Sequence, residues 1–325
     1  MKIVIDMMGG DNGLKATISA TKEFLKLHPG VELFLVGDET KLNEFKGKDN
    51  IHIFNSDTVL AMDVDPLSAL KEHSSSLMVA IKAYLDNKCD ALISAGSTGA
   101  LLSASIFKIK RIEGITRPCL ITSFPTIDRN KKFVVCDLGA NNANTKEEIA
   151  QFAKMGSIYY SLLYKQESPK VYLLSNGSED EKGSPLNKDA FPLLKEDKEI
   201  NFIGNIEARD PLFGMVDVLV TDGFTGNIFL KSVEGTAKAM SQMIKEAFKE
   251  NIFTMIGYLF SKKGINGIKE KMDYKNVGGA LLMGVNGVVI KAHGSSDTKS
   301  FLSALNNAYN LVDEDIIKRF KDKLK

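Results

Sequence analysis

Short apolar runs rich in β-branched residues alternate with longer amphipathic runs along the whole chain. The short runs, each of a length typical of a buried strand, lie at residues 2–5, 32–36, 91–93, 133–136, 171–174 and 218–220. The longer runs, whose apolar residues follow helical spacing, lie at residues 16–28, 76–87, 146–164 and 230–249. This alternation predicts an α/β fold, a Rossmann-like α/β/α sandwich with a mostly parallel sheet.

The chain shows no internal repeat and no Pro- or Ser-rich linker, so we expect one domain over residues 1–325. One segment, at 237–272, departs from the alternation. Helically spaced apolar residues there are followed by residues 252–260, of which seven of nine are large and apolar. We interpret this segment as a protruding helical hairpin.

Composition excludes several classes of protein. The net charge of +1 gives no overall attraction to nucleic acid, so no nucleic-acid partner is expected. The three cysteines lie in apolar runs without a CxxC pair, which leaves a metal site unsupported. No apolar run reaches the ~18 residues of a spanning helix, and no nucleotide-binding fingerprint is present. We therefore expect a cytoplasmic protein without cofactor or metal.

Five turns that follow candidate strands are rich in Gly, Asn, Ser, Thr and Asp. They lie at residues 6–11, 94–100, 137–141, 221–227 and 291–296. Ligands of parallel α/β sheets bind at the carboxyl ends of the strands. Glycine lets the backbone approach a ligand, and free N–H groups at a helix start bind anions. Each turn alone is equally well explained by turn geometry, but five together indicate a pocket for phosphate or an oxyanion.

Eight motifs in these turns and elsewhere resemble those of one family. In chain order they are IDMMGGD (5–11), SAGSTGALL (94–102), RIEGITRP (111–118), DLGAN (137–141), EKG (181–183), GNIEARD (204–210), DGFTGN (222–227) and IKAHGSSD (290–297). Together they resemble the phosphate acyltransferases of bacterial phospholipid synthesis over nearly the whole chain. Ser97 stands where the family usually has asparagine, and its hydroxyl preserves a hydrogen-bond donor.

The resemblance implies transfer of a fatty acyl group from acyl carrier protein to inorganic phosphate, which makes acyl phosphate. Phosphate is already nucleophilic and a thiol, with a pKa near ~8.5, leaves readily, so no activated serine or cysteine is needed. The site has instead to gather phosphate, stabilise an oxyanion and exclude water.

The resemblance also singles out three candidate catalytic residues. Lys182 is the candidate phosphate clamp, against the alternative of a solvated loop lysine. Asn227 is a candidate donor to the oxyanion or phosphate, although asparagine is also a good helix cap. His293 is the candidate general acid or base, and a turn histidine that only forms hydrogen bonds is the alternative. The predicted substrate-binding residues are Asp6, Gly9, Gly10, Asp11, Gly96, Ser97, Thr98, Gly99, Asn141, Asp222, Thr225, Gly226 and Ser295.

Carrier proteins are acidic, so their docking face should be basic. The cluster Lys108, Lys110, Arg111 and Arg117 is the candidate, against the alternative of a solvated helix end.

The hairpin offers a membrane contact through an apolar tip followed by two lysines. The candidate contact residues are Phe253, Ile256, Leu259, Phe260, Lys262 and Lys263. Packing in a dimer is the alternative, and one hairpin can serve both. The resemblance implies a homodimer at the inner face of the cell membrane. It also implies that the acyl phosphate passes to a membrane glycerol-3-phosphate acyltransferase.

Two alternatives of function stay open at this point. The same general fold can carry an oxidoreductase or a phosphotransacetylase-like enzyme that uses acyl-CoA; the missing dinucleotide fingerprint argues against the oxidoreductase. The chain could also be a non-catalytic scaffold that binds acyl carrier protein, against which the presence of Lys182, Asn227 and His293 argues.

Overall fold

The computed structural model describes residues 1–128, 130–272 and 278–324, and its centre is one eleven-stranded sheet. The strands are β1 (Lys2–Asp6), β2 (Glu32–Gly37), β3 (Ile51–Asn55), β4 (Ala91–Ser94), β5 (Cys119–Pro125), β6 (Lys132–Cys136), β7 (Lys170–Ser175), β8 (Asn201–Glu207), β9 (Val218–Val220), β10 (Ala280–Met283) and β11 (Val288–Lys291). The six strands expected from the sequence are all present, with ends that differ by at most a residue or two.

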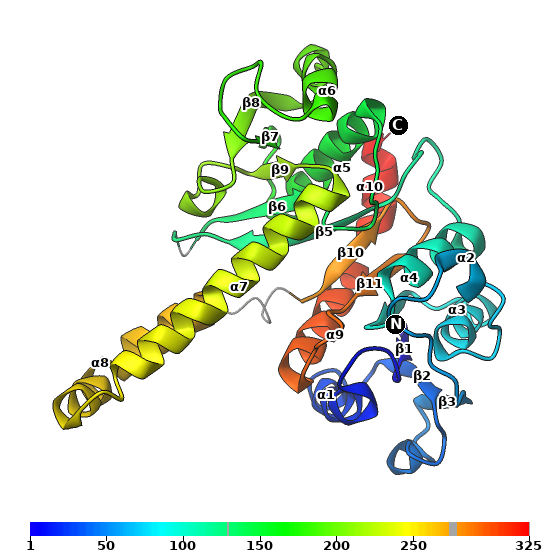
Figure 1. Cartoon of the computed structure of the whole chain (residues 1–325). Coiled ribbons are helices and arrows are strands. Elements are labelled where there is room, and N and C mark those ends of the chain that lie inside the picture. Colours follow the sequence, from blue (N-terminus) through cyan, green and yellow to red (C-terminus); the bar gives the residue numbers. More distant parts are fainter. Residues whose placement is uncertain (129, 273–277, 325) are drawn as a thin grey trace.

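Helices connect most of the strands (Figure 1). They are α1 (Gly13–Leu27), α2 (Pro66–Ala69), α3 (Ser76–Asp86), α4 (Thr98–Ala104), α5 (Lys146–Tyr164), α6 (Pro185–Glu196), α7 (Gly223–Ala247), α8 (Ile252–Met272), α9 (Thr298–Asp313) and α10 (Ile316–Leu324). A π-helical turn, Ser105–Ile109, extends α4, and two short 3-10 helices lie at Asn43–Phe45 and Pro211–Phe213. The helix expected over 230–249 begins earlier, at Gly223, because the Asp222 carboxylate caps it by accepting the Thr225 N–H at 2.9 Å.

The sheet has two parallel parts joined by antiparallel strands. Its order is β3-β2-β1-β4-β11-β10-β5-β6-β9-β7-β8. Strands β3, β2, β1, β4 and β11 are parallel to one another, and so are β6, β9, β7 and β8. Strands β10 and β5, which lie between these two groups, pair antiparallel with their neighbours. This arrangement confirms the predicted α/β fold with a mostly parallel sheet.

A separate hydrophobic core covers each face of the sheet. Alternation along β1 sends Ile3 and Ile5 to one core and Val4 to the other. The first core is closed by α1, α5, α6, α9 and α10, and the second by α3, α4 and the start of α7. Both faces of the strands are therefore buried, which explains why the strand sequences are almost continuously apolar.

The predicted hairpin is formed by α8 and the distal part of α7, which project from the body of the molecule (Figure 1). Large apolar side chains on it are exposed, Phe253 and Phe260 by 82% and 87%. Within the described residues, no helix combines the length and apolar character needed to cross a membrane.

Candidate active site

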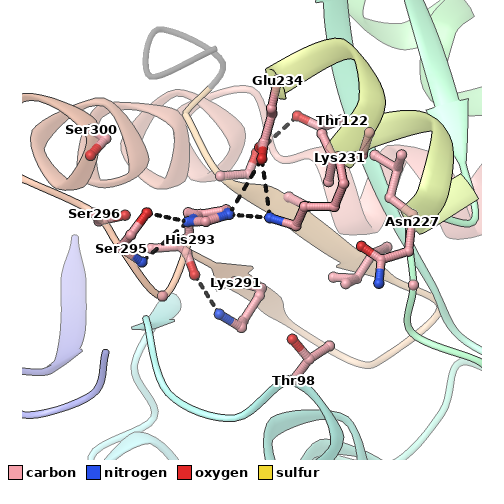
Figure 2. A pocket seen from close by; sticks show the side chains of 18 of the residues that line it. Thr98, Thr122, Asn227, Lys231, Glu234, Lys291, His293, Ser295, Ser296 and Ser300 are labelled. Carbon is pink, nitrogen blue, oxygen red and sulfur yellow. Dashed lines mark hydrogen bonds and ion pairs between the residues drawn. The ribbon is translucent and has the colours of Figure 1, made fainter. Parts of the chain in front are cut away.

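A cavity of about 360 Å³ opens between the two parallel parts of the sheet (Figure 2). Four turns that follow strands reach it: Asp11 comes after β1, Thr98 after β4, Gly139 after β6 and His293 after β11. The floor is one face of β5, whose alternate residues Leu120, Thr122 and Phe124 line the cavity. Asn227, the last residue of the predicted turn 221–227 after β9, lines the cavity as well, so each of the five expected turns contributes to its wall.

Helix α7 supplies a polar edge to the cavity. Asn227, Lys231 and Glu234 all line it, and their spacing of four and three residues places them on one face of the helix. The Asn227 side chain also lies over Gly139, where an added Cβ would come within 3.1 Å of the Asn227 Cβ. Glycine at 139, with a φ of +107°, therefore lets the β6 turn pass close beneath Asn227.

His293 lies in a polar cluster with α7 (Figure 2). Its Nδ1 accepts the Ser295 N–H at 3.1 Å. Its Nε2 is 3.6 Å from Glu234 Oε2 and contacts the Lys231 ammonium. Burial lowers the pKa of His293, the charge of Lys231 lowers it further, and Glu234 opposes both. The imidazole is consequently neutral near pH 7.

Lys291, the last residue of β11, is a buried cation in the cavity wall. Its Nζ donates to the carbonyl oxygens of Ala95 at 3.2 Å and Ala292 at 2.5 Å. Burial lowers the pKa of Lys291 to about 8, with a further decrease from Lys231 and opposition from Asp6 and Asp11. The side chain thus carries positive charge at neutral pH in a place where little water screens it.

The structure brings five of the predicted site residues into the cavity wall. They are Asp11, Thr98, Asn227, His293 and Ser295. The other predicted residues do not line the cavity, and several of them pack or hydrogen-bond between the turns that do. Asp6 is one example: its buried carboxylate accepts the Ser94 hydroxyl at 2.7 Å and the Met8 N–H at 3.2 Å. Burial raises the pKa of Asp6, while these hydrogen bonds oppose the increase.

Several predicted glycines allow close packing between turns. An added Cβ at Gly9 would lie 2.5 Å from the Gly96 nitrogen, and one at Gly10 would lie 2.7 Å from the Gly294 oxygen. At Gly99 it would meet Pro66. These glycines join the turns after β1, β4 and β11 into one wall, and direct contact with substrate stays a prediction for them.

Ser97, Asp222 and Thr225 shape helix starts. Ser97 caps α4 by accepting the Ala100 N–H at 3.5 Å, and the donor role expected of its hydroxyl stays a prediction. Asp222 accepts both the backbone N–H of Thr225 and its hydroxyl, the latter at 2.7 Å.

Lys182 lies apart from the cavity lining, in the loop after β7. Its side chain is exposed and packs over Gly177, and its backbone oxygen accepts the Asn205 side-chain amide at 3.4 Å. The predicted role as phosphate clamp therefore stays a prediction that needs its own test.

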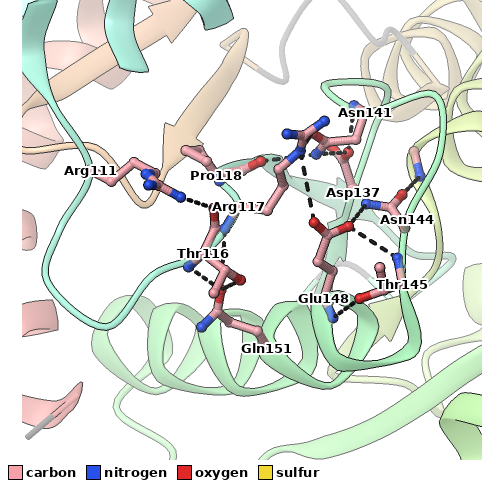
Figure 3. A network of polar contacts seen from close by, with 11 residues as sticks. Arg111, Thr116, Arg117, Pro118, Asp137, Asn141, Asn144, Thr145, Glu148 and Gln151 are labelled. Atoms are coloured by element: carbon pink, nitrogen blue, oxygen red, sulfur yellow. Dashed lines mark hydrogen bonds and ion pairs between the residues drawn. The ribbon is translucent and has the colours of Figure 1, made fainter. Parts of the chain in front are cut away.

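Arg117 and Asn141 belong to a polar network behind the β6 turn (Figure 3). The Arg117 Nε donates to Asn141 Oδ1 at 2.8 Å, and Asn141 Nδ2 donates to the Asp137 carboxylate at 2.8 Å. Burial raises the pKa of Asp137, against four opposing hydrogen bonds. The guanidinium also lies 4.0 Å from Glu148. All four residues of the basic cluster, Lys108, Lys110, Arg111 and Arg117, are exposed, and Arg111 donates to the Thr116 carbonyl.

Sequence reasoning missed three charged residues of the cavity wall, Lys231, Glu234 and Lys291. Lys231 and Glu234 follow Asn227 at helical spacing, a signal that depends on starting the helix at Gly223. Lys291 ends a strand of otherwise apolar residues, VVIK, and a lysine at the carboxyl end of a buried strand was a usable signal. No group of three potential metal ligands is found among the residues that the structure describes.

Comparison with known proteins decides the family. The family model described as "Fatty acid synthesis protein" matches residues 1–319. A phosphate acyltransferase of Lysinibacillus sphaericus is 44% identical over 319 residues, covering 98% of this chain and 96% of that protein. One from an Exiguobacterium species is 42% identical over 325 residues, with 99% and 98% covered. The chain belongs to the phosphate acyltransferase family. It is therefore an acyltransferase, and the oxidoreductase and scaffold alternatives are set aside.

Among solved structures, the acyltransferase resembles a branched-chain phosphotransacylase from Enterococcus faecalis. The TM-score is 0.62 at 15% identity, with 96% of this chain and 99% of that chain covered. A likeness at this identity shows a shared fold and leaves the substrates to be argued from the site.

Proposed function

We propose that this acyltransferase moves an acyl group from acyl carrier protein to inorganic phosphate in the cavity beside α7. The observation that carries the proposal is the pair of cations, Lys291 and Lys231, in a cavity whose wall also contains apolar side chains and the carboxylates of Asp11 and Glu234. Two cations in such a place suit a small anion next to an acyl group. The apolar part of the wall consists of Met62, Leu120, Phe124, Leu138, Leu230, Ala280 and Ala292.

In the proposed reaction an unprotonated oxygen of hydrogen phosphate attacks the thioester carbonyl. A carbon–oxygen bond forms, the carbon–sulfur bond breaks, and the proton of hydrogen phosphate finally resides on the departing thiol. Neither step needs a covalent intermediate with the protein. The role left to the protein is to hold two reactants and to stabilise negative charge, which fixed cations and amide donors do well in a water-poor site.

We assign roles on the basis of position. Lys291 and Lys231 neutralise phosphate, and the Asn227 amide, one turn before Lys231 on α7, donates to the oxyanion. His293, beside Lys231 and Glu234, is the candidate to exchange a proton or a hydrogen bond with the reactants. Lys182 is kept as a candidate clamp: its alanine variant should reduce kcat/KM for phosphate if the β7 loop closes over the cavity, and leave it unchanged if the lysine is only solvated.

The KM for phosphate should rise with pH above about 8. The pKa of Lys291 is lowered from 10.5 to about 8, so the side chain is charged below that pH and loses its charge above it. Hydrogen phosphate keeps its charge over this range, so the only charge lost is that of Lys291. We expect KM to increase by up to about tenfold per pH unit. Initial rates at constant ionic strength between pH 7 and 9.5 measure this, and a flat or falling KM would contradict it.

The docking of acyl carrier protein is proposed at the exposed basic residues Lys108, Lys110 and Arg111. Lys110 and Arg111 border a shallow hollow that also includes Glu113 and Phe107, which is 59% exposed, and Lys108 is the next residue after Phe107. An acidic partner would meet positive charge around one apolar contact. Such charge complementarity increases the association rate more than the affinity. Arg117, held by Asn141 and near Glu148, is less available for docking.

The hairpin tip is proposed to contact the inner face of the cell membrane and, together with α7, to serve a homodimer. Replacing Phe260 with aspartate should weaken binding to vesicles of phosphatidylglycerol and phosphatidylcholine by about 10- to 100-fold, because a buried phenylalanine is worth about 1.5–3 kcal/mol. Vesicle co-sedimentation measures this. Phe213→Asp, at a phenylalanine that is 63% exposed away from the hairpin, is the control. Unchanged vesicle binding with loss of the dimer would assign the tip to dimerisation alone.

The proposed function is tested by following thiol release from palmitoyl-acyl carrier protein with and without phosphate. We expect phosphate-dependent release, and slower release from palmitoyl-CoA or acetyl-CoA. Equal rates from acetyl-CoA would favour a phosphotransacetylase-like enzyme. Thiol release that does not depend on phosphate would show a thioesterase and contradict the proposal.

A further inference from the structure

Glu234 is a carboxylate in a cavity that should bind an anion. Its side chain is 11% exposed and lines the cavity from α7. One oxygen, Oε2, lies 3.1 Å from the Lys231 ammonium and 3.6 Å from His293 Nε2 (Figure 2). These two contacts fix the orientation of the carboxylate, and the other oxygen, Oε1, takes part in neither.

A carboxylate at this position repels any bound anion, which requires a compensating role. Phosphate differs from the other common tetrahedral dianion, sulfate, in one respect: at neutral pH it still carries a proton. An ionised carboxylate can only accept hydrogen bonds. It therefore favours the anion that has a hydroxyl to donate and opposes the one that has none.

We propose that Glu234 accepts a hydrogen bond from the P–OH group of hydrogen phosphate and so sets the preference of the site for phosphate over sulfate. The inference rests on the proposed function, because it takes phosphate to be the anion bound between Lys291 and Lys231. The proton stays on phosphate in this contact. Sulfate has no proton to donate. It would place lone pairs against the Glu234 oxygen that accepts from phosphate, and it would leave that nearly buried oxygen without a donor from the anion.

The expected size of the preference follows from the strength of such contacts. A hydrogen bond to a charged group contributes about 1.5–3 kcal/mol, and about 1.4 kcal/mol corresponds to tenfold in affinity. Phosphate should therefore bind about 10- to 100-fold more tightly than sulfate. Lys231 and Lys291 attract both anions alike, so they raise affinity without providing this selectivity.

The experiment is a calorimetric titration of sodium phosphate and of sodium sulfate into the full-length protein at one pH and one ionic strength. The wild type should bind phosphate about 10- to 100-fold more tightly. Glu234→Gln keeps the shape of the side chain and supplies an N–H donor, so it should bring the ratio near one, mainly through tighter sulfate binding. Glu246→Gln, at an exposed position farther along α7, is the matched control and should keep the wild-type ratio.

Three outcomes would overturn the inference. The first is equal affinity of the wild type for the two anions, which needs no variant and does not depend on the folding of one. The second is a wild-type ratio retained in Glu234→Gln. The third is loss of the ratio in Asp11→Asn instead, which would assign the role to the other carboxylate of the cavity wall. Phosphate-dependent thiol release without anion selectivity would disprove the role of Glu234 alone. If the protein neither bound phosphate nor released thiol, the proposed function would be disproved as well.

Discussion

Replacement of Lys291 by methionine should lower kcat/KM for phosphate by about 100- to 1000-fold. The methionine side chain has a similar length, but it removes the buried charge that faces the cavity and both Nζ hydrogen bonds. Losing one preorganised donor to developing charge typically costs an enzyme this much. Initial rates with phosphate varied at saturating acyl donor measure the effect.

The same variant separates catalysis from stability. Burial disfavours the charged form of Lys291, as its lowered pKa shows, so a neutral side chain should leave the melting temperature at pH 7 unchanged or higher. Lys245→Met, on the distal part of α7, is the control for loss of a lysine and should keep full activity. If the loss of activity in Lys291→Met ran in parallel with a lower melting temperature, the lysine would be structural rather than part of the phosphate site.

Replacement of Gly226 by alanine should destabilise the protein by about 3 to 5 kcal/mol. An added Cβ would lie 1.8 Å from the Asp137 backbone oxygen, a separation that only a shift of the β6 turn or of α7 can relieve. Since this turn carries Leu138 and Gly139 into the cavity, activity should fall as well. Urea unfolding followed by circular dichroism measures the change.

The matched control for this variant is Gly235→Ala on the same helix. No atom lies within 4 Å of an added Cβ there, so alanine should stabilise the protein by up to about 1 kcal/mol through its helix propensity. Equal stability changes at positions 226 and 235 would show that α7 does not press against the β6 turn as the structure has it.

The layered fold could be predicted because its evidence is local. Runs such as residues 91–93 and 218–220 are short, apolar and bounded by turn residues, and they became β4 and β9. Strand order and direction could not be predicted in this way. β10 and β5 join the two parallel parts by antiparallel pairing, and that depends on contacts between segments far apart in the chain.

The site could be predicted in part for the same physical reason. Asp11, Thr98 and His293 lie in turns that follow strands, so the rule that parallel strands present ligands at their carboxyl ends identified their turns, and the resemblance to the family singled out the residues. Lys231 and Glu234 resemble residues of a solvated helix face in the sequence, and only the packing of α7 against the cavity distinguishes them.

The proposed acyl transfer to phosphate is tested most directly by trapping acyl phosphate with hydroxylamine. Purified protein is mixed with palmitoyl-acyl carrier protein and phosphate, and the hydroxamate is measured for the wild type and for Lys291→Met. We expect hydroxamate that requires phosphate and that falls by at least about 100-fold in the variant at subsaturating phosphate. No phosphate-dependent hydroxamate from the folded wild type across several acyl chain lengths would contradict the proposed reaction, and equal yields from both proteins would contradict the assigned site.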